Sequence, residues 1–300
     1  FGSGKSHFLK ILSYLLSNQE VCGKRAIDYF ADKFDDPMMY AQAVKSVSVP
    51  TQSILFNIDI EGPLTKDKTA VLRVFAKMFY NHCGFYGDDL KIAKLERFIE
   101  KQGKTQQFRE AFEKVNGAPW TETRDSFAFF EDDIVSVLQS TLGMSEQAAR
   151  NWFNGEETNE LSIAQLVADI QEYVDGKGKD FRLLFMVDEV GQYIGDDGDL
   201  MINLQSLVEE IGIRCHGKVW VMVTSQEAID SVVHITGNDF SKIQGRFNTR
   251  LSLSSSSVDE VIKKRVLAKT DAADQLLRMV YDCLLYTSPS PRDSTSYRMP

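Results

Sequence analysis

The chain has 300 residues, of which 43% are hydrophobic and 26% charged, an ordinary composition for a soluble globular protein. Its formal net charge of -9 at pH 7 excludes a general attraction to nucleic acids or anionic membranes, although it is compatible with a local basic patch. No apolar run approaches the roughly 18 residues that cross a bilayer. The four cysteines are scattered without metal-ligand spacing, which favours reduced thiols and a cytoplasmic location.

The first residues of the chain carry the most specific motif. Phe1-Gly2-Ser3-Gly4-Lys5-Ser6 matches the second half of the phosphate-binding pattern G-x-x-x-x-G-K-[ST]. In such a loop, backbone N–H groups surround the phosphates, the lysine contacts the β- and γ-phosphates, and the hydroxyl contributes to Mg²⁺ binding. A chance match in a surface loop is the alternative, but apolar residues at helical spacing follow directly, as the motif requires. We therefore predict a nucleotide-binding loop formed by Gly2, Ser3, Gly4, Lys5, Ser6 and His7. Ser6 is also predicted to be a metal ligand, and His7 is expected to pack beside the helix start.

Both ends of the chain depart from what this motif requires. The opening glycine of the pattern would lie before Phe1, so we expect the β-strand that carries the loop to be missing from this sequence. At the other end, Cys283–Asp293 resembles a translated sequencing adapter, and we interpret residues 283–300 as a non-native tail.

Hydrophobic periodicity predicts an α/β fold with a parallel sheet, because buried strands alternate with helices. Strands are expected at 53–60, 182–187 and 218–223, with a short candidate at 249–253. Helices are expected at 24–34, 38–47, 200–211 (ending at Gly212) and 258–268. Residues 64–179 contain several amphipathic helical stripes and no convincing strand. The aromatic residues at 120, 127, 129 and 130 in this region are interpreted as core in preference to a partner surface.

The predicted organisation is the parallel-sheet core of a P-loop NTPase, without its first strand and interrupted by a large helical insertion. Residues 1–62 form the first part of the core, 63–180 the insertion or lid, and 181–270 the remainder of the core. Residues 271–282 begin a further helical region, and 283–300 are the tail.

A pair of acids follows the apolar run at 182–187. Because ligands bind outside the carboxyl ends of parallel strands, Asp188 is predicted to hold Mg²⁺ directly or through water. Glu189 is predicted to act as the general base that polarises the attacking water. Two solvated acids at a strand end are the alternative interpretation.

Polar residues also follow the next strand. Either Ser225 or Thr224 is placed to lie beside the γ-phosphate and orient the water. Ser225 is equally well explained as the N-cap of a following helix, and the two roles do not exclude each other.

Two arginines near the end of the core are candidates for contact with a neighbouring subunit's nucleotide. Arg246 is the first candidate and Arg250 the second, because an arginine at a subunit edge can stabilise the charge of the transition state. A structural salt bridge explains either residue equally well. A trans-acting arginine would imply a homo-oligomer.

The combination of phosphate loop, acid pair, polar strand end and arginine resembles the AAA+ class of P-loop ATPases, especially its replication-initiator-like and STAND-like branches. The runs Val187–Ile194 and Val219–Glu227, together with Phe1–Lys10, resemble more narrowly the large P-loop protein of BREX phage-defence systems. This resemblance covers most of residues 1–282.

The resemblance implies an ATP-hydrolysing cytoplasmic protein, longer than this chain, that works with a DNA methyltransferase and a phosphatase-like protein to block phage DNA replication. A DNA-binding surface would lie in regions outside this sequence. The alternatives are a nucleotide-gated scaffold with little turnover, and a replication-initiator or helicase-loader ATPase with the same chemistry and different partners.

Overall fold

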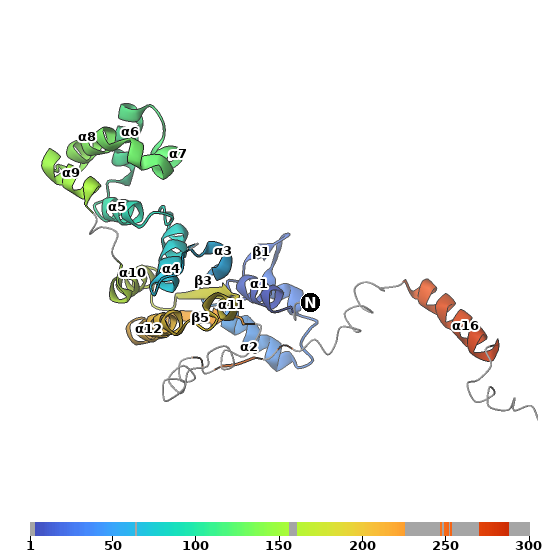
Figure 1. Cartoon of the computed structure of the whole chain (residues 1–300). Helices are drawn as coiled ribbons and strands as arrows, with labels where there is room; N and C mark the ends of the chain where they lie inside the picture. Colours follow the sequence, from blue (N-terminus) through green and yellow to red (C-terminus); the bar gives the residue numbers. More distant parts are fainter. Residues whose placement is uncertain are drawn as a thin grey trace, which may run out of the picture. The chain divides into compact units, whose positions relative to one another are not determined.

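A computed structural model describes residues 4–63, 65–155, 161–225, 247, 249–251, 253 and 270–287 (Figure 1). Residues 4–250 form one unit, and residues 1–3 with 251–300 are assigned to a second. In the second unit, helix α16 (Asp271–Thr287) has exposed apolar side chains and an ion pair of 2.9 Å between Arg278 and Asp274. It continues through Cys283, the position at which the sequence suggests a non-native tail.

The unit of residues 4–250 combines a small parallel sheet with many helices. Its strands are β1 (Glu20–Val21), β2 (Lys24–Arg25), β3 (Thr51–Asn57), β4 (Arg182–Asp188) and β5 (Val219–Val223). Its first helices are α1 (Lys5–Leu16), the 3-10 helix η1 (Ala26–Phe30), α2 (Pro37–Val47), α3 (Ile58–Glu61), α4 (Ala70–His82) and α5 (Leu90–Lys101). Then follow α6 (Thr105–Asn116), α7 (Trp120–Thr123), the 3-10 helix η2 (Arg124–Phe129), α8 (Glu131–Leu142), α9 (Glu146–Asn154), α10 (Ile163–Gly176), α11 (Val190–Ile194) and α12 (Gly198–Arg214).

The central sheet is parallel and has the order β3-β4-β5. β3 and β4 pair along their full length, from Thr51 opposite Arg182 to Asn57 opposite Asp188. β5 pairs with β4 up to Val187 opposite Val223. Since parallel strands end at one edge, this register brings Asn57, Asp188 and the residues after Val223 to the same edge of the sheet. The α/β class with a parallel sheet predicted from the sequence is therefore confirmed.

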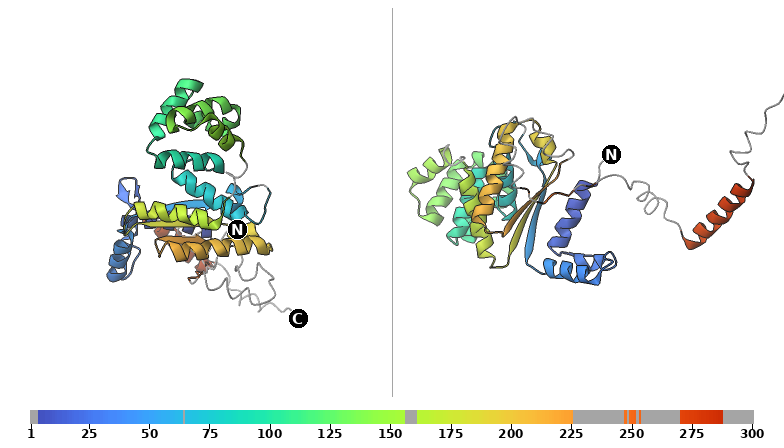
Figure 2. Two further views of the ribbon diagram at one scale, coloured as in Figure 1. Left: turned by 90° about the vertical axis from the view of Figure 1, so that its left-hand side faces the viewer. Right: turned by 90° about the horizontal axis from the view of Figure 1, so that it is seen from below.

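β4 is buried on both faces, as expected for a central parallel strand. Leu183, Phe185 and Val187 belong to a large hydrophobic core, the sheet cluster, to which α4, α10 and α12 contribute. Leu184 and Met186 point to the opposite face and pack against Leu9, Leu12 and Leu16 of α1. Figure 2 shows α1 on one side of the sheet and α10 and α12 on the other.

α1 lies over the middle of the sheet, and its N-terminus lies at the edge where the strands end. Ser13 Oγ is 2.7 Å from Ser53 Oγ of β3. Lys5 lies about 12 Å along the helix from Ser13, and Asn57 about 13 Å along the strand from Ser53. In the right-hand view of Figure 2 the N-terminal end of α1 lies at the same end of the sheet as α11, the helix that follows β4. The start of α1 and the carboxyl ends of the strands are therefore neighbours.

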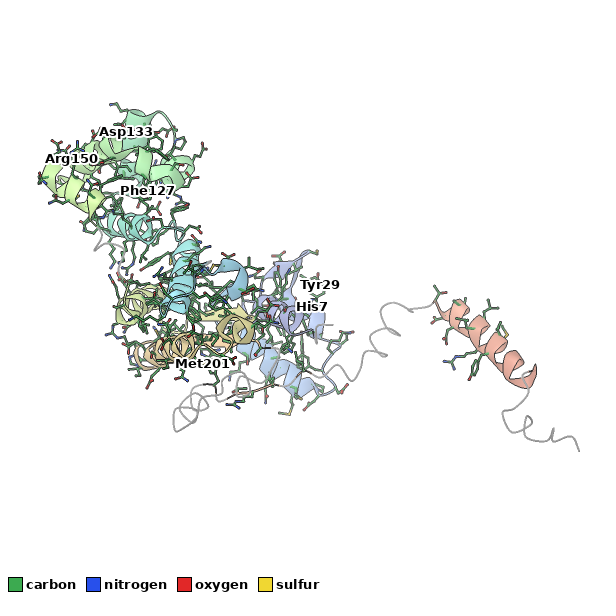
Figure 3. All side chains as sticks on the ribbon, viewed as in Figure 1. His7, Tyr29, Phe127, Asp133, Arg150 and Met201 are labelled. Carbon is green, nitrogen blue, oxygen red and sulfur yellow. The ribbon has the colours of Figure 1, made fainter. Side chains whose placement is uncertain are left out.

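The segment from α5 to α9 forms a second hydrophobic core, the helical cluster, built on Ile99, Phe108, Phe112, Trp120 and Leu138. Figure 3 marks it with Phe127, Asp133 and Arg150. Its described residues contain no strand, as the sequence predicts for this region. Trp120 is buried in this cluster. Phe127 and Phe130 are partly buried and pack against the cluster, whereas Phe129 is 86% exposed. The interpretation of the aromatic residues as core is thus wrong for Phe129.

Several element boundaries differ from those expected from the sequence. The strand expected to reach residue 60 ends at Asn57, because Asn57 Oδ1 accepts hydrogen bonds from the N–H groups of Asp59 (2.9 Å) and Ile60 (3.3 Å) and caps α3. α12 does not stop at Gly212 but continues to Arg214.

Other expectations fail in the periphery of the fold. Residues 24–30, expected to be helical throughout, form β2 and a 3-10 helix. β5 was expected to be buried, but Trp220 is 48% exposed. Among residues 249–251 and 253 none is in a strand, and the helix expected at 258–268 lies outside the described residues. None of the described helices is long and apolar enough to cross a membrane.

Glu96 is a buried acid that links three parts of the helical cluster by hydrogen bonds. Its carboxylate is 8% exposed and accepts hydrogen bonds from the N–H of Tyr86 (2.6 Å), Trp120 Nε1 (2.7 Å) and an Arg124 guanidinium nitrogen (2.9 Å). Glu96→Ala should lower the free energy of unfolding by about 3–5 kcal/mol, because Arg124 and Trp120 lose their buried partner. Urea denaturation followed by circular dichroism measures this. Glu100→Ala, one turn later and exposed, is the control and should change stability by less than about 0.5 kcal/mol; equal losses would contradict the assignment.

Candidate functional site

The described part of the phosphate-binding motif forms a helix start. Gly4 is the N-cap of α1 and has left-handed backbone angles, φ 78° and ψ 12°. A Cβ atom there would meet nothing within 4 Å, so it is the backbone conformation that favours glycine. Lys5, Ser6 and His7 form the first turn of α1, where Ser6 and His7 are exposed and Lys5 is half-buried. Gly2 and Ser3 lie outside the described residues.

The predicted acid pair lies at the carboxyl end of β4. Asp188 and Glu189 are both half-buried. Thr224 Oγ1 donates a hydrogen bond to Asp188 Oδ1 and accepts one from the Glu189 N–H at 3.0 Å. The Val190 N–H donates to the Thr224 carbonyl at 3.0 Å, so the pairing of β4 with β5 continues beyond the strands themselves. Thr224 thereby holds the Asp188 carboxylate and the Glu189 backbone together.

Asn57 is a site residue that the sequence analysis missed. Its side-chain Nδ2 donates a hydrogen bond of 2.6 Å to Glu189 Oε2. Because a hydrogen bond to a charged acceptor is stronger than a neutral one, this contact fixes the orientation of the Glu189 carboxylate. A polar residue near the end of an apolar strand could have indicated this role. Because the strand is expected to reach residue 60, Asn57 is instead placed within the strand.

The other polar residue after β5 has a different environment. Ser225 Oγ is buried and has no hydrogen-bond partner among the described residues. It lies so close to Gly191 that a Cβ there would be 2.0 Å from it. The sequence leaves Ser225 and Thr224 as alternatives for the role beside the phosphates. In the structure Thr224 contacts the acid pair, whereas Ser225 packs against α11. The helix that Ser225 would cap lies outside the described residues.

Only one of the two arginine candidates lies among the described residues. Arg246 lies outside the described residues. Arg250 is exposed and belongs to no helix or strand. The structure thus brings together Lys5, Ser6, Asp188, Glu189 and Thr224 at one edge of the sheet, and adds Asn57.

A magnesium ion fits the chemistry of these residues. Mg²⁺ commonly binds one or two carboxylates and keeps its other positions for phosphate oxygens and water. The Thr224 hydroxyl occupies only Oδ1 of Asp188, and no hydrogen bond within the described residues occupies its Oδ2. In the described ranges no group of three or more His, Cys, Asp or Glu could enclose a metal. Asp188 and Ser6 could each supply an oxygen ligand to Mg²⁺, with phosphate oxygens and water in its other positions.

Comparison with known proteins leaves the site to be judged by its geometry. No protein-family model matches the chain, and no solved structure matches it.

We expect the Thr224 hydroxyl to stabilise the fold as well as to hold the Asp188 carboxylate in position. Thr224→Val keeps the shape of the side chain but leaves Asp188 and the Glu189 N–H without their shared partner. We expect the free energy of unfolding to fall by about 1–3 kcal/mol in a denaturant titration. Thr224→Ser restores the hydroxyl and should recover most of the loss. An equal loss in both variants would show that the methyl group, not the hydroxyl, is important.

Proposed function

We propose that this protein binds ATP with Mg²⁺ and hydrolyses it, as a P-loop ATPase of the AAA+ type. The observation that carries the proposal is the meeting of three features at one sheet edge. These are the start of α1 with Lys5 and Ser6, the acid pair after β4, and the polar ends of the two neighbouring strands. In an open α/β sheet, this edge is where ligands bind.

The sheet order agrees with the proposed class. In AAA+ proteins the strand before the phosphate loop lies beside the strand that follows the acid-bearing one. The order β3-β4-β5 has this arrangement if that strand pairs with the outer edge of β5. An additional strand there would also cover the half-exposed Trp220.

Each residue has a definite task in this mechanism. The Lys5 ammonium neutralises phosphate charge, and Ser6 and Asp188 supply oxygen ligands for Mg²⁺, the ion that offsets charge on the β- and γ-phosphates when bound. Glu189 accepts a proton from the attacking water through its carboxylate. Thr224 keeps Asp188 in place through its hydroxyl. Arg246 or Arg250 of a neighbouring copy would complete the site in a homo-oligomer.

The broader role is proposed from resemblance alone. The runs around residues 1–10, 187–194 and 219–227 resemble the large P-loop protein of BREX systems. On this basis the protein works in anti-phage defence in the cytoplasm, with a methyltransferase and a phosphatase-like protein, and with DNA through regions outside this sequence.

The acid pair and the lysine give the first test. Steady-state ATP turnover and ATP binding are measured on the protein and its variants. Glu189→Gln should lower turnover by about 10²–10⁴-fold while ATP still binds, because only the general base is lost. Lys5→Ala should weaken ATP binding itself.

Matched controls lie close by. Lys10→Ala removes an exposed lysine from the same helix, and Glu20→Gln an exposed acid from β1. Both should leave binding and turnover unchanged. If Glu189→Gln turns over ATP at the normal rate, Glu189 is not the base.

A second function is favoured by one contact. In the structure the Asn57 amide holds the Glu189 carboxylate at 2.6 Å, so one of its two oxygens is already occupied. A base held in this way is less available to water, which suits a nucleotide-gated scaffold that assembles partners and turns over ATP slowly. Such a scaffold would assemble when ATP is added and show negligible turnover.

The two proposed functions predict different effects of Asn57 substitutions on ATP turnover. Asn57→Asp keeps the oxygen that caps α3 but cannot donate to Glu189, and Asn57→Ala loses both contacts. If Asn57 restrains an ATPase, both variants should raise turnover by about tenfold. Turnover that stays negligible in both, with ATP-dependent assembly by light scattering, supports the scaffold. A fall in turnover in both would mean that Asn57 orients the base productively.

A further inference from the structure

A cavity of about 140 Å³ lies between α5 and α6, away from the proposed ATP site. Its apolar wall consists of Phe85, Ile99, Phe108 and Trp120. Phe85 belongs to the sheet cluster, and the other three belong to the helical cluster. The cavity therefore lies where the two hydrophobic cores meet.

Two polar side chains of α6 line this cavity without protein partners. Thr105 and Arg109 are one helical turn apart, so they share a face of the helix. Thr105 Oγ1 and Arg109 Nε are both buried and have no hydrogen-bond partner among the described residues. The Arg109 guanidinium also forms no ion pair within the described part of the chain. The guanidinium is an N–H donor only, so leaving its buried Nε without an acceptor is unfavourable.

The acids on the cavity wall do not neutralise Arg109. Glu96 is fully engaged by Tyr86, Trp120 and Arg124, and the Arg124 guanidinium balances its charge. Glu100 is exposed, so water screens its carboxylate. The cavity thus presents two buried polar atoms without partners among the described residues, Thr105 Oγ1 and Arg109 Nε, beside apolar walls.

A larger neighbouring cavity differs in this respect. It has a volume of about 550 Å³ and shares Cys83, Phe85 and Glu100 with the smaller one, so the two adjoin. Its principal charges are paired with each other: Arg97 contacts Asp169 at 2.7 Å and Glu172 at 2.5 Å, and Lys101 contacts Glu172 at 2.6 Å. The buried polar atoms without partners therefore lie in the smaller cavity.

We propose that the smaller cavity binds a small organic carboxylate. The carboxylate accepts hydrogen bonds from Arg109 Nε and Thr105 Oγ1, and the N-terminal end of α6 adds a favourable dipole. The apolar body of the ligand packs against Phe108, Trp120 and Ile99. A cavity of about 150 Å³ is known to accommodate benzene, so a volume of about 140 Å³ limits the apolar body of the ligand to a single ring at most. An inorganic anion would leave the apolar walls uncovered.

Benzoate is the probe for this site, and the whole chain is titrated with it by calorimetry. Benzyl alcohol has the same ring without the charge and serves as the ligand control. Benzoate should bind saturably with 1:1 stoichiometry and at least about tenfold more tightly than benzyl alcohol, because only the carboxylate satisfies Arg109.

Two variants of α6 locate the binding. Arg109→Met should weaken benzoate binding about tenfold or more, whereas Lys114→Met, which removes an exposed cation from the same helix, should change it less than about twofold. Arg109→Met should not lower the melting temperature of the free protein, because no described residue loses a partner. Benzoate should raise that temperature in the unmodified protein and in Lys114→Met, but not in Arg109→Met.

Three results would overturn the proposal. The first is the absence of saturable benzoate binding to folded protein. The second is equal affinity for benzoate and benzyl alcohol, which would describe an apolar cavity only. The third is benzoate binding that Arg109→Met leaves unchanged.

Discussion

The full-length pairing of β3 with β4 is the constraint on which the candidate site depends. It places Asn57 directly opposite Asp188, and so brings an amide within hydrogen-bond distance of the next residue, Glu189. A slip of one residue would turn the apolar side chains of β3 away from the core and remove this contact. The same strand, β4, orients α1 through its other face, because Leu184 and Met186 provide the surface on which Leu9 packs. One ladder thus positions both α1 and the acids.

The sequence predicted the centre of the molecule better than its edges. β4 was predictable because five consecutive apolar residues, Leu183–Val187, followed by two acids have few other structural explanations. The end of β3 was not, because Ile58-Asp59-Ile60 continues the apolar pattern, and only the capping bond from Asn57 shows that the chain turns there. The capping role depends on a side-chain rotamer that periodicity does not reveal. The hydrogen-bond partners of Glu189 and of Thr224 are likewise residues more than 30 positions away in sequence, which periodicity does not reveal.

The helical segment illustrates a different limit of sequence analysis. Its stripes identify a buried face correctly for Phe108 and Phe112, although Val115 of the same stripe is 47% exposed. They do not identify polar groups that are buried within such faces. Glu96, which accepts three hydrogen bonds, and Arg109, whose Nε has no acceptor among the described residues, look alike in sequence as charged residues on amphipathic helices. Only the three-dimensional neighbourhood separates a structural anchor from an unsatisfied donor.

The backbone of Glu189 has a consequence for how this protein changes over evolution. Its φ of 62° is in the left-handed region, which costs a residue with a Cβ about 1–2 kcal/mol relative to glycine. Asparagine also tolerates this conformation better than glutamate does. The chain therefore gives up stability to keep a carboxylate at this position. In descendants that no longer need that carboxylate, selection for stability alone would favour glycine or asparagine here, so the identity of this residue would record whether the carboxylate is still required in a lineage.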